Sequence, residues 1–306
     1  MTKIFNPLKK GDIINIVSPA GKIAPEILKK AVYNLEDYGF KVRVSEHVLS
    51  EYHQFAGTDE NRIKDFQKAI DDDSACILCA RGGYGSIRII DKLDFSNFKK
   101  KQKLLIGFSD ISIFHAVLNN LGIASIHGNM LKGLNNMNSK SSQKLLKAMM
   151  GKNLEYSIEN CSLNRKGEVE TSIIGGNLSI LYSLLGTPYF PNTKGKILFI
   201  EDLNEQLYHL DRMMHSLKFS GVLENLAGLI VGAFFDMKNG SSPFGKTANE
   251  IIAEHVSDYS YPVCFNFPAG HIDDNNPIIF GKSTKFSVKT NCSKLGFYNY
   301  LSVFSL

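Results

Sequence analysis

The chain has 306 residues, roughly twice the length that one hydrophobic core comfortably serves, so we expect two domains. Hydrophobic residues make up 43% and charged residues 21%, a globular composition that argues against long disordered segments. The net charge of +5 is spread along the chain. Its longest basic cluster, KKKQK at 99–103, is interpreted as a solvated loop, so no nucleic-acid partner is expected.

The cysteines and the apolar runs bear on the compartment. Cys76 and Cys79 form a CxxC inside ACILCA, but alternation along a strand directs them to opposite faces, which suits neither a metal site nor a redox pair. All five cysteines are interpreted as structural thiols in a reducing compartment, with no metal bound. The N-terminus has no signal-peptide pattern, and no apolar run reaches the roughly 18 residues of a membrane helix. The prediction is a soluble cytoplasmic protein with no membrane partner.

In the first half of the chain, short apolar runs alternate with helical patterns. The runs predicted as strands are 12–19, 40–46, 75–80, 104–108 and 123–128. Helical patterns follow at 24–39, at 59–72 after the capping residue Thr58, from 86, and at 110–122. Nearly all-apolar strands separated by amphipathic helices predict a parallel sheet covered on both faces.

The second half predicts a smaller α/β domain with a more mixed sheet. A polar stretch with one helix at 144–151 precedes a loose segment, so residues 1–150 are assigned to the N-terminal domain, 151–166 to a linker and 167–306 to the C-terminal domain. Strands are predicted at 194–202, 228–234 and 261–267, with two more within 277–288. Helices are predicted near 177–186, 204–219 and 247–257.

Ligands of parallel α/β sheets bind at the carboxyl ends of the strands. Three segments of the first domain have this position: SPAG at 18–21, RGGYG at 81–85 and GFSD at 107–110. In GFSD, a serine stands between a strand and a helix, which resembles a nucleophile elbow, although Ile111 breaks the usual GxSxG form. The alternative is that Ser109 or Asp110 caps the helix. RGGYG predicts exposed amides that cradle an oxyanion, or only a tight turn.

A serine nucleophile needs a base, and the base needs an orienting group. Among the eight histidines, His127 and His271 follow apolar strands. Glu201 closes a predicted strand beside Asp202, as an orienting carboxylate would. The spacing does not choose between the two histidines, so the residues alone lead only as far as a serine hydrolase.

Eight motifs in order resemble the L,D-carboxypeptidases, a serine peptidase family that includes muramoyl-tetrapeptide carboxypeptidase and the microcin-immunity peptidases. The resemblance covers nearly the whole chain, through IVSPAG, AGTDENR, ARGGYG, LIGFSD, HGNM, IGGNLS, LFIED and AGHIDDNNPIIFG. It implies an N-terminal flavodoxin-like domain followed by a C-terminal swivelling β/α domain.

The resemblance also implies a Ser-Glu-His triad made of Ser109, Glu201 and His271, with Glu205 as a rival for Glu201. In this interpretation the C-terminal domain delivers the base to Ser109 across an interface between the domains.

Further site residues are predicted around this triad. The backbone amides of Gly83 and Asp110 are the candidate oxyanion hole. Arg81 is a candidate partner for the terminal carboxylate of the substrate, or forms only a structural ion pair. Three residues after a strand of the second domain and one aromatic residue are candidates for holding the substrate: Gly175, Gly176, Asn177 and Tyr84.

The implied substrate is a cytoplasmic murein tetrapeptide that loses its terminal D-alanine during peptidoglycan recycling. No cofactor is implied, and a homodimer is the common assembly. A microcin-immunity-type peptidase that cleaves peptidyl- or aminoacyl-nucleotides is the nearest alternative, although the chain has no Trp to stack a base. A non-catalytic nucleotide- or anion-binding module is an alternative of another class.

Overall fold

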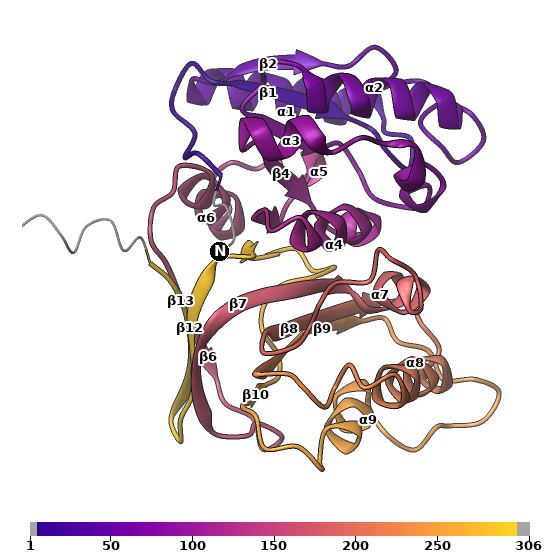
Figure 1. Cartoon of the computed structure of the whole chain (residues 1–306), viewed down its shortest axis with the longest axis vertical. Coiled ribbons are helices and arrows are strands. Elements are labelled where there is room, and N and C mark those ends of the chain that lie inside the picture. Colours follow the sequence, from indigo (N-terminus) through magenta and orange to yellow (C-terminus); the bar gives the residue numbers. More distant parts are fainter. Residues whose placement is uncertain (1–4, 299–306) are drawn as a thin grey trace, which may run out of the picture.

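The five strands of the first half and one strand of the second half form a six-stranded sheet in the computed structural model, which describes residues 5–298 (Figure 1). The strand order is β11-β5-β4-β3-β1-β2, and the neighbours are parallel except β11 and β5. Its strands are β1 (Ile13–Val17), β2 (Lys41–Val44), β3 (Cys76–Cys79), β4 (Leu104–Gly107), β5 (Ser125–His127) and β11 (Ile278–Phe280).

A second sheet has seven strands in the order β10-β9-β8-β7-β12-β13-β6. Strands β7 to β10 are parallel, whereas β12, β13 and β6 pair antiparallel. Its strands are β6 (Leu154–Glu159), β7 (Gly167–Asn177), β8 (Ile197–Leu203), β9 (Gly228–Phe235), β10 (Val263–Cys264), β12 (Ser283–Val288) and β13 (Cys292–Phe297). The predicted α/β class, with one largely parallel sheet and one mixed sheet in two domains, is confirmed.

Helices cover both sheets, and α4 lies between the two layers (Figure 1). The α-helices are α1 (Pro25–Tyr38), α2 (Asp59–Asp71), α3 (Ser96–Lys101), α4 (Ser112–Asn120), α5 (Leu131–Leu134), α6 (Lys140–Met149), α7 (Leu178–Leu184), α8 (Leu207–Phe219) and α9 (Ala248–His255). Short 3-10 turns are η1 (Ser86–Arg88), η2 (Ile90–Lys92) and η3 (Ser109–Ile111). Thr58 caps α2 as predicted, because its hydroxyl accepts the Asn61 amide at 3.3 Å.

The predicted linker at 151–166 is wrong in one respect, because it contains β6. The side chains of LEYSIE alternate between buried and exposed positions, and the strand pairs with β13 along its whole length. Its flanking polar residues concealed this period of two. Residues 278–280 of the second half also complete the first sheet as β11, so the two sheets do not divide at one point of the sequence.

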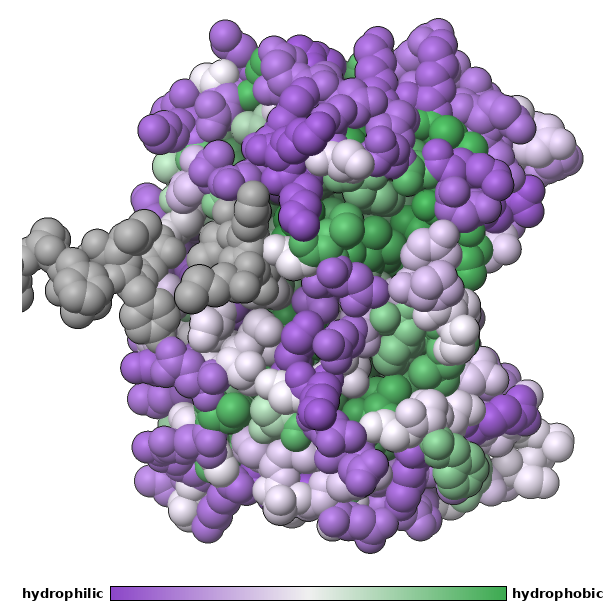
Figure 2. Space-filling model, in the orientation of Figure 1, coloured by the Kyte–Doolittle hydropathy of each residue, from purple (hydrophilic) through white to green (hydrophobic). Residues whose placement is uncertain are grey.

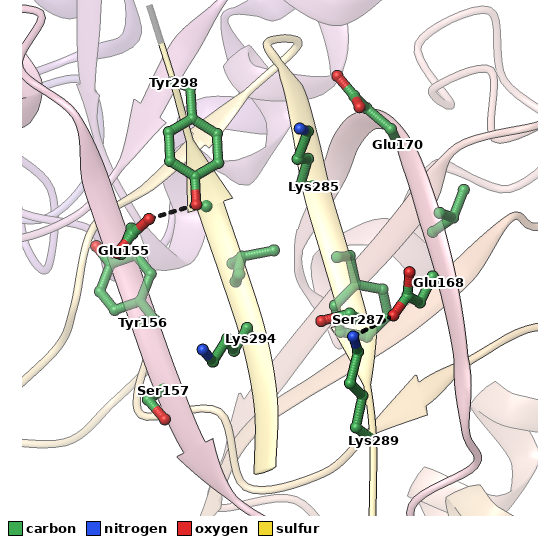
Figure 3. Close-up of a pocket in the computed structure, with 14 residues that line it drawn as sticks. Glu155, Tyr156, Ser157, Glu168, Glu170, Lys285, Ser287, Lys289, Lys294 and Tyr298 are labelled. Atoms are coloured by element: carbon green, nitrogen blue, oxygen red, sulfur yellow. Dashed lines mark hydrogen bonds and ion pairs between the residues drawn. The ribbon is translucent and has the colours of Figure 1, made fainter.

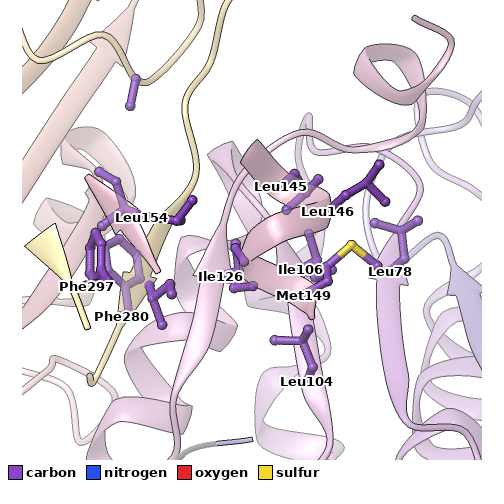
Figure 4. Packing of buried hydrophobic residues seen from close by; sticks show 14 of the residues in the cluster. Leu78, Leu104, Ile106, Ile126, Leu145, Leu146, Met149, Leu154, Phe280 and Phe297 are labelled. Atoms are coloured by element: carbon purple, nitrogen blue, oxygen red, sulfur yellow. The ribbon is translucent and has the colours of Figure 1, made fainter. Parts of the chain in front are cut away.

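Buried side chains of both halves join in one cluster (Figure 4). Leu78, Ile106 and Ile126 of the first sheet share it with Phe280 and Phe297. Cys76 belongs to this cluster, but the side chain of Cys79 lies in another one on the opposite face of β3. The predicted divergence of the two thiols is therefore confirmed.

Hydrophilic side chains cover most of the face drawn in Figure 2, and hydrophobic ones gather near its middle, between the two layers. Within residues 5–298, no helix is long and apolar enough to cross a membrane. The prediction of a solvated loop at 99–103 is wrong, because residues 99–101 form the last turn of α3 and Lys103 is buried, with its Nζ 2.6 Å from Asp72 Oδ1.

Candidate active site

Ser109 stands at the turn between β4 and α4 in a strained backbone conformation. Its φ is +65°, a left-handed value that residues with a Cβ rarely adopt, and it begins the η3 turn. Strain of this kind costs about 1–3 kcal/mol and persists where the surrounding structure imposes it. The predicted strand–turn–helix is present, and its half-buried serine has the backbone of a nucleophile elbow.

The glycine-rich turn after β3 lies directly against Ser109. A Cβ on Gly82 would be 2.8 Å from Ser109 Cβ and 3.0 Å from Oγ, so only glycine fits there. The carbonyl of Gly82 accepts the Gly21 amide at 3.0 Å, which ties the SPAG loop to the same turn. All three strand-end segments predicted from the sequence therefore meet at one edge of the first sheet.

The two predicted oxyanion donors flank this turn. Gly83 is exposed with φ +103°, and its amide donates to no acceptor within residues 5–298. The Asp110 side chain is buried, and its Oδ2 accepts the Ser86 amide at 2.8 Å. Burial raises the pKa of Asp110 above its ordinary value. This carboxyl therefore anchors the RGGYG turn to the start of the serine helix.

Glu201 and His271 form a close pair. Glu201 lies near the end of β8, and its Oε2 lies 2.7 Å from His271 Nδ1. The glutamate is fully buried, whereas the imidazole is 16% exposed and so is accessible from outside. Burial opposes charge on both groups. The neighbouring imidazoles of His127 and His271 outweigh burial at Glu201 and lower the pKa of its carboxyl, and Glu201 outweighs burial at His271 and raises the pKa of that imidazole.

The imidazole of His271 reaches the serine turn through Phe108. The ring of Phe108, which precedes Ser109, lies 4.9 Å from the His271 ring between centroids. Within residues 5–298, no hydrogen bond joins Ser109 Oγ to His271, an arrangement that unliganded active sites often have.

The helix that follows Ser109 is docked on the second sheet at the strand beside Glu201. Ser112 Oγ accepts the Asn177 amide at 2.9 Å, and Asn177 pairs with Glu201 across β7 and β8. A Cβ on Gly176 would lie 2.3 Å from Ser112 Oγ, so glycine permits this close approach. This contact places the serine turn and the Glu201–His271 pair at one interface between the domains.

The structure uses Gly175, Gly176 and Asn177 for packing, and their predicted contact with substrate stays a prediction. They end β7 rather than follow it. A Cβ on Gly175 would lie 1.9 Å from the Phe199 carbonyl oxygen. The buried Asn177 donates to Asp202 Oδ1 at 2.9 Å.

Asp202 was not singled out for a role of its own in the sequence. It is buried, and its Oδ2 accepts the Ser179 amide at 2.8 Å. Burial, together with the charge of Glu201, raises the pKa of Asp202 to about 7. No motif around this residue distinguishes it from a loop carboxylate.

Arg81 and Tyr84 lie at the outer side of the glycine turn, and both are exposed. Arg81 donates to the Lys22 carbonyl at 2.9 Å rather than to a carboxylate, so the structural ion pair weighed as its alternative is absent within residues 5–298. Tyr84 is 47% exposed, and its ring lies 6.0 Å from that of Phe55.

Two hollows lie elsewhere on the second domain. One, of about 800 Å³, lies over β6, β13, β12 and β7 and is lined by charged pairs such as Lys289 with Glu168 at 2.8 Å (Figure 3). The other, of about 430 Å³, lies between the end of β9 and the start of α9 and reaches Ile272, the neighbour of His271. No local sequence pattern predicts the second hollow, because its lining comes from four separate segments.

Metal-ligand groupings lie outside the triad residues. In the described part of the chain, two groups bring three ligand atoms within 4.8 Å of one another: Asp211, His215 and His255, and Glu46, His47 and Asp65. Among residues 5–298, no tight grouping of this kind includes Glu201 or His271.

Comparisons with known proteins show the family of this chain. The family models described as LD-carboxypeptidase N-terminal domain and LD-carboxypeptidase C-terminal domain match residues 14–128 and 170–286. A probable murein peptide carboxypeptidase of Bacillus subtilis (strain 168) is 32% identical over 281 residues, covering 90% of this chain and 88% of that protein.

Solved structures extend the likeness. The crystal structure of muramoyltetrapeptide carboxypeptidase from Oxalobacter formigenes superposes with a TM-score of 0.86 at 28% identity, covering 94% of this chain and 99% of that one. The structure of MccF in complex with glutamyl sulfamoyl guanosine has a TM-score of 0.84 at 20% identity, covering 97% and 98% of the two chains, which is a likeness of fold. This chain therefore belongs to the LD-carboxypeptidase family and is a peptidase.

Proposed function

We propose that the protein is a serine L,D-carboxypeptidase that releases terminal D-alanine from murein tetrapeptides in the cytoplasm, as part of peptidoglycan recycling. The observation that carries the proposal is the Glu201–His271 pair, 2.7 Å between Oε2 and Nδ1, beside the strained turn of Ser109. The printed names of the relatives, murein peptide carboxypeptidase and muramoyltetrapeptide carboxypeptidase, support this substrate class.

The chemistry follows from the tautomer that Glu201 selects. An Nδ1–H that donates to Glu201 leaves the Nε2 lone pair of His271 free to accept the Ser109 proton. Ser109 Oγ bonds to the carbonyl carbon, the C–N bond breaks, and His271 returns the proton to the departing amine of D-alanine. Water then attacks the acyl carbon and gives a proton to His271. The ester C–O bond to Ser109 breaks, His271 returns this proton to Ser109 Oγ, and the shortened peptide leaves.

Backbone amides stabilise the negative charge of the tetrahedral intermediates in this proposal. The free amide of Gly83 and that of Asp110, which follows Ser109, are the proposed donors. Each donor of this kind typically contributes about 3 kcal/mol to transition-state stabilisation. Arg81 has further N–H groups besides the one bonded to Lys22, and these are proposed to bind the terminal carboxylate of the substrate.

The alternative, cleavage of an acyl-nucleotide, uses the same triad. The fold likeness to MccF with glutamyl sulfamoyl guanosine supports it, and the exposed Tyr84 is an aromatic surface beside the glycine turn. The absence of Trp from the sequence favours the wall peptide. On the resemblance alone we also propose a homodimer, which light scattering on a size-exclusion column would test.

The purified chain is incubated with a murein tetrapeptide and, separately, with an aminoacyl sulfamoyl adenosine, and products are identified by mass. We expect loss of one alanine from the peptide, abolished in Ser109→Ala and retained in the control Ser216→Ala, a half-buried serine on α8 whose hydroxyl donates to the Arg212 carbonyl of the same helix. Cleavage of the nucleotide analogue alone would favour the alternative. Binding of either compound without turnover, unchanged in Ser109→Ala, would favour a non-catalytic module.

A further inference from the structure

The imidazole of His127 is buried without a hydrogen-bond partner. Its side chain has no exposure, and both Nδ1 and Nε2 lack a partner within residues 5–298. Buried polar atoms in folded proteins are nearly always paired, so an imidazole with two unpaired nitrogens requires an explanation. Full burial also separates His127 from His271, because only the latter has an exposed edge that a substrate can reach.

An unpaired oxygen of Glu201 faces this imidazole. Glu201 Oε2 is bonded to His271, whereas Oε1 has no hydrogen-bond partner in the described chain. His127 Nε2 lies 4.0 Å from that oxygen, which is about 1 Å longer than a hydrogen bond. A small rotation of either side chain would therefore satisfy two unpaired atoms at once.

The surroundings of His127 are largely aromatic. Aromatic rings enclose it, with centroids 5.1 Å away for Phe199 and 5.7 Å away for Phe108 and Phe280. The titratable groups near His127 are Glu201 on β8 and His115 on α4. His271 and Asp202 lie on the far side of Glu201.

The imidazole of His115 already has hydrogen-bond partners and does not need His127 or Glu201 as one. Its Nδ1 lies 2.8 Å from Ser125 Oγ and its Nε2 lies 2.9 Å from the Gly107 carbonyl oxygen, so both of its nitrogens are engaged. Glu201 is therefore the one carboxylate within 4.0 Å of His127 in the described chain.

We propose that His127 is a positioning residue that donates Nε2–H to Glu201 Oε1, so that an imidazole holds each oxygen of the carboxylate. This inference rests on the proposed serine peptidase function, because its purpose is to fix the group that orients His271. His127 ends β5 of the first sheet, and Glu201 lies near the end of β8 in the second. The same hydrogen bond therefore joins the serine-bearing domain to the base-bearing domain at the site.

Two matched variants separate positioning from packing. His127→Phe keeps an aromatic ring in the aromatic enclosure but removes both nitrogens, whereas His127→Gln keeps an N–H near the position of Nε2. We expect kcat for alanine release to fall about tenfold or more in His127→Phe, with KM nearly unchanged, because a second partner of a catalytic group typically contributes that much. His127→Gln is expected to stay within about threefold of the wild type.

A second readout needs no turnover. Without the hydrogen bond from His127, the Glu201 carboxylate can rotate and stabilises the His271 imidazolium less. The pKa of His271, measured by ¹⁵N NMR, is therefore expected to fall toward the ordinary histidine value in His127→Phe and to stay at the wild-type value in His127→Gln. In the wild type, the Nε2 proton of His127 is expected to exchange slowly and to change its resonance in Glu201→Gln. This last measurement needs no variant of His127 and holds even if His127→Phe does not fold.

Several outcomes would overturn the inference. In His127→Phe, an unchanged kcat together with an unchanged pKa of His271, or a pKa of His271 that rises, would do so. Equal losses of kcat in His127→Phe and His127→Gln, with the pKa of His271 unchanged in both, would do so as well. So would a resonance of the wild-type His127 Nε2 proton that does not change in Glu201→Gln. A wild type that releases no alanine would instead count against the proposed function, while the NMR measurements would still decide whether His127 holds Glu201.

Discussion

Ser109 combines two features that a helix cap does not need. Its φ of +65° is strained for a residue with a Cβ, and Gly82 stands where any side chain would collide with it. Capping by serine uses an ordinary extended conformation, as Thr58 does at α2 with φ −70°. The η3 turn before α4 has no side-chain cap at all. The geometry therefore argues for a reactive hydroxyl and against the capping alternative.

At the residue scale, Glu201→Gln is expected to lower kcat by about 10²–10⁴-fold with little change in KM, because an amide selects the wrong imidazole tautomer. Glu205→Gln is the matched control: Glu205, the rival predicted from the sequence, pairs instead with His209, 2.6 Å between Oε2 and Nδ1. Steady-state kinetics of alanine release measure both. An equal loss in Glu205→Gln would contradict the assignment of Glu201.

The pH dependence of activity follows from the raised pKa of His271. The base acts only when neutral, so kcat/KM is expected to rise with pH through a midpoint above about 6.5, the ordinary value for histidine. For folding the sign is opposite: the raised pKa stabilises the native state at pH below the unfolded pKa, and this contribution is lost as pH rises through the folded value. A pH profile of kcat/KM checks the first statement, and a midpoint well below 6.5 would contradict it.

At the scale of elements, the glycine turn after β3 is the part of the site most sensitive to volume. Gly82→Ala is expected to lower kcat by at least about tenfold while the protein stays folded. The added methyl group would lie only 2.8 Å from Ser109 Cβ, so the serine would have to move from its position. Gly240→Ala is the control, since a Cβ there meets no atom within 4 Å. Kinetics together with circular dichroism measure both effects. Wild-type activity in Gly82→Ala would show that the turn does not constrain the serine.

The elements differ in how well their sequences predict them. The buried strands of the first sheet and the helix after Thr58 were predicted, because apolar runs and capping residues are local signals. The strand β6 was missed, since three alternating apolar residues among polar neighbours form a strand only when β13 pairs with them. The packing role of Gly176 was also missed, because its partner Ser112 lies 64 positions earlier in the chain.

At the scale of the whole molecule, β11 joins the two halves. Phe280 is 2% exposed and belongs to the core cluster that both sheets share. Phe280→Ala is expected to lower the free energy of unfolding by about 3–5 kcal/mol, whereas Phe219→Ala, at a side chain 81% exposed, is expected to change it by less than about 0.5 kcal/mol. Urea denaturation followed by fluorescence and circular dichroism measures both. A loss in Phe280→Ala no larger than in Phe219→Ala would contradict the role of β11 in the shared core.

The sequence by itself determined the alternation of strands and helices, the glycine turns and the identity of the candidate residues, because each depends on neighbours a few positions away. Only the tertiary structure decided that His271 Nδ1 lies 2.7 Å from Glu201 Oε2, whereas the buried His127 Nε2 lies 4.0 Å from Oε1. It also decided that β11 joins the first sheet. Both histidines follow apolar strands, so no local pattern separates them. Their difference is set by burial and by their distances to Glu201, which is 70 or more positions away from each of them, so it arises only when the two sheets pack together.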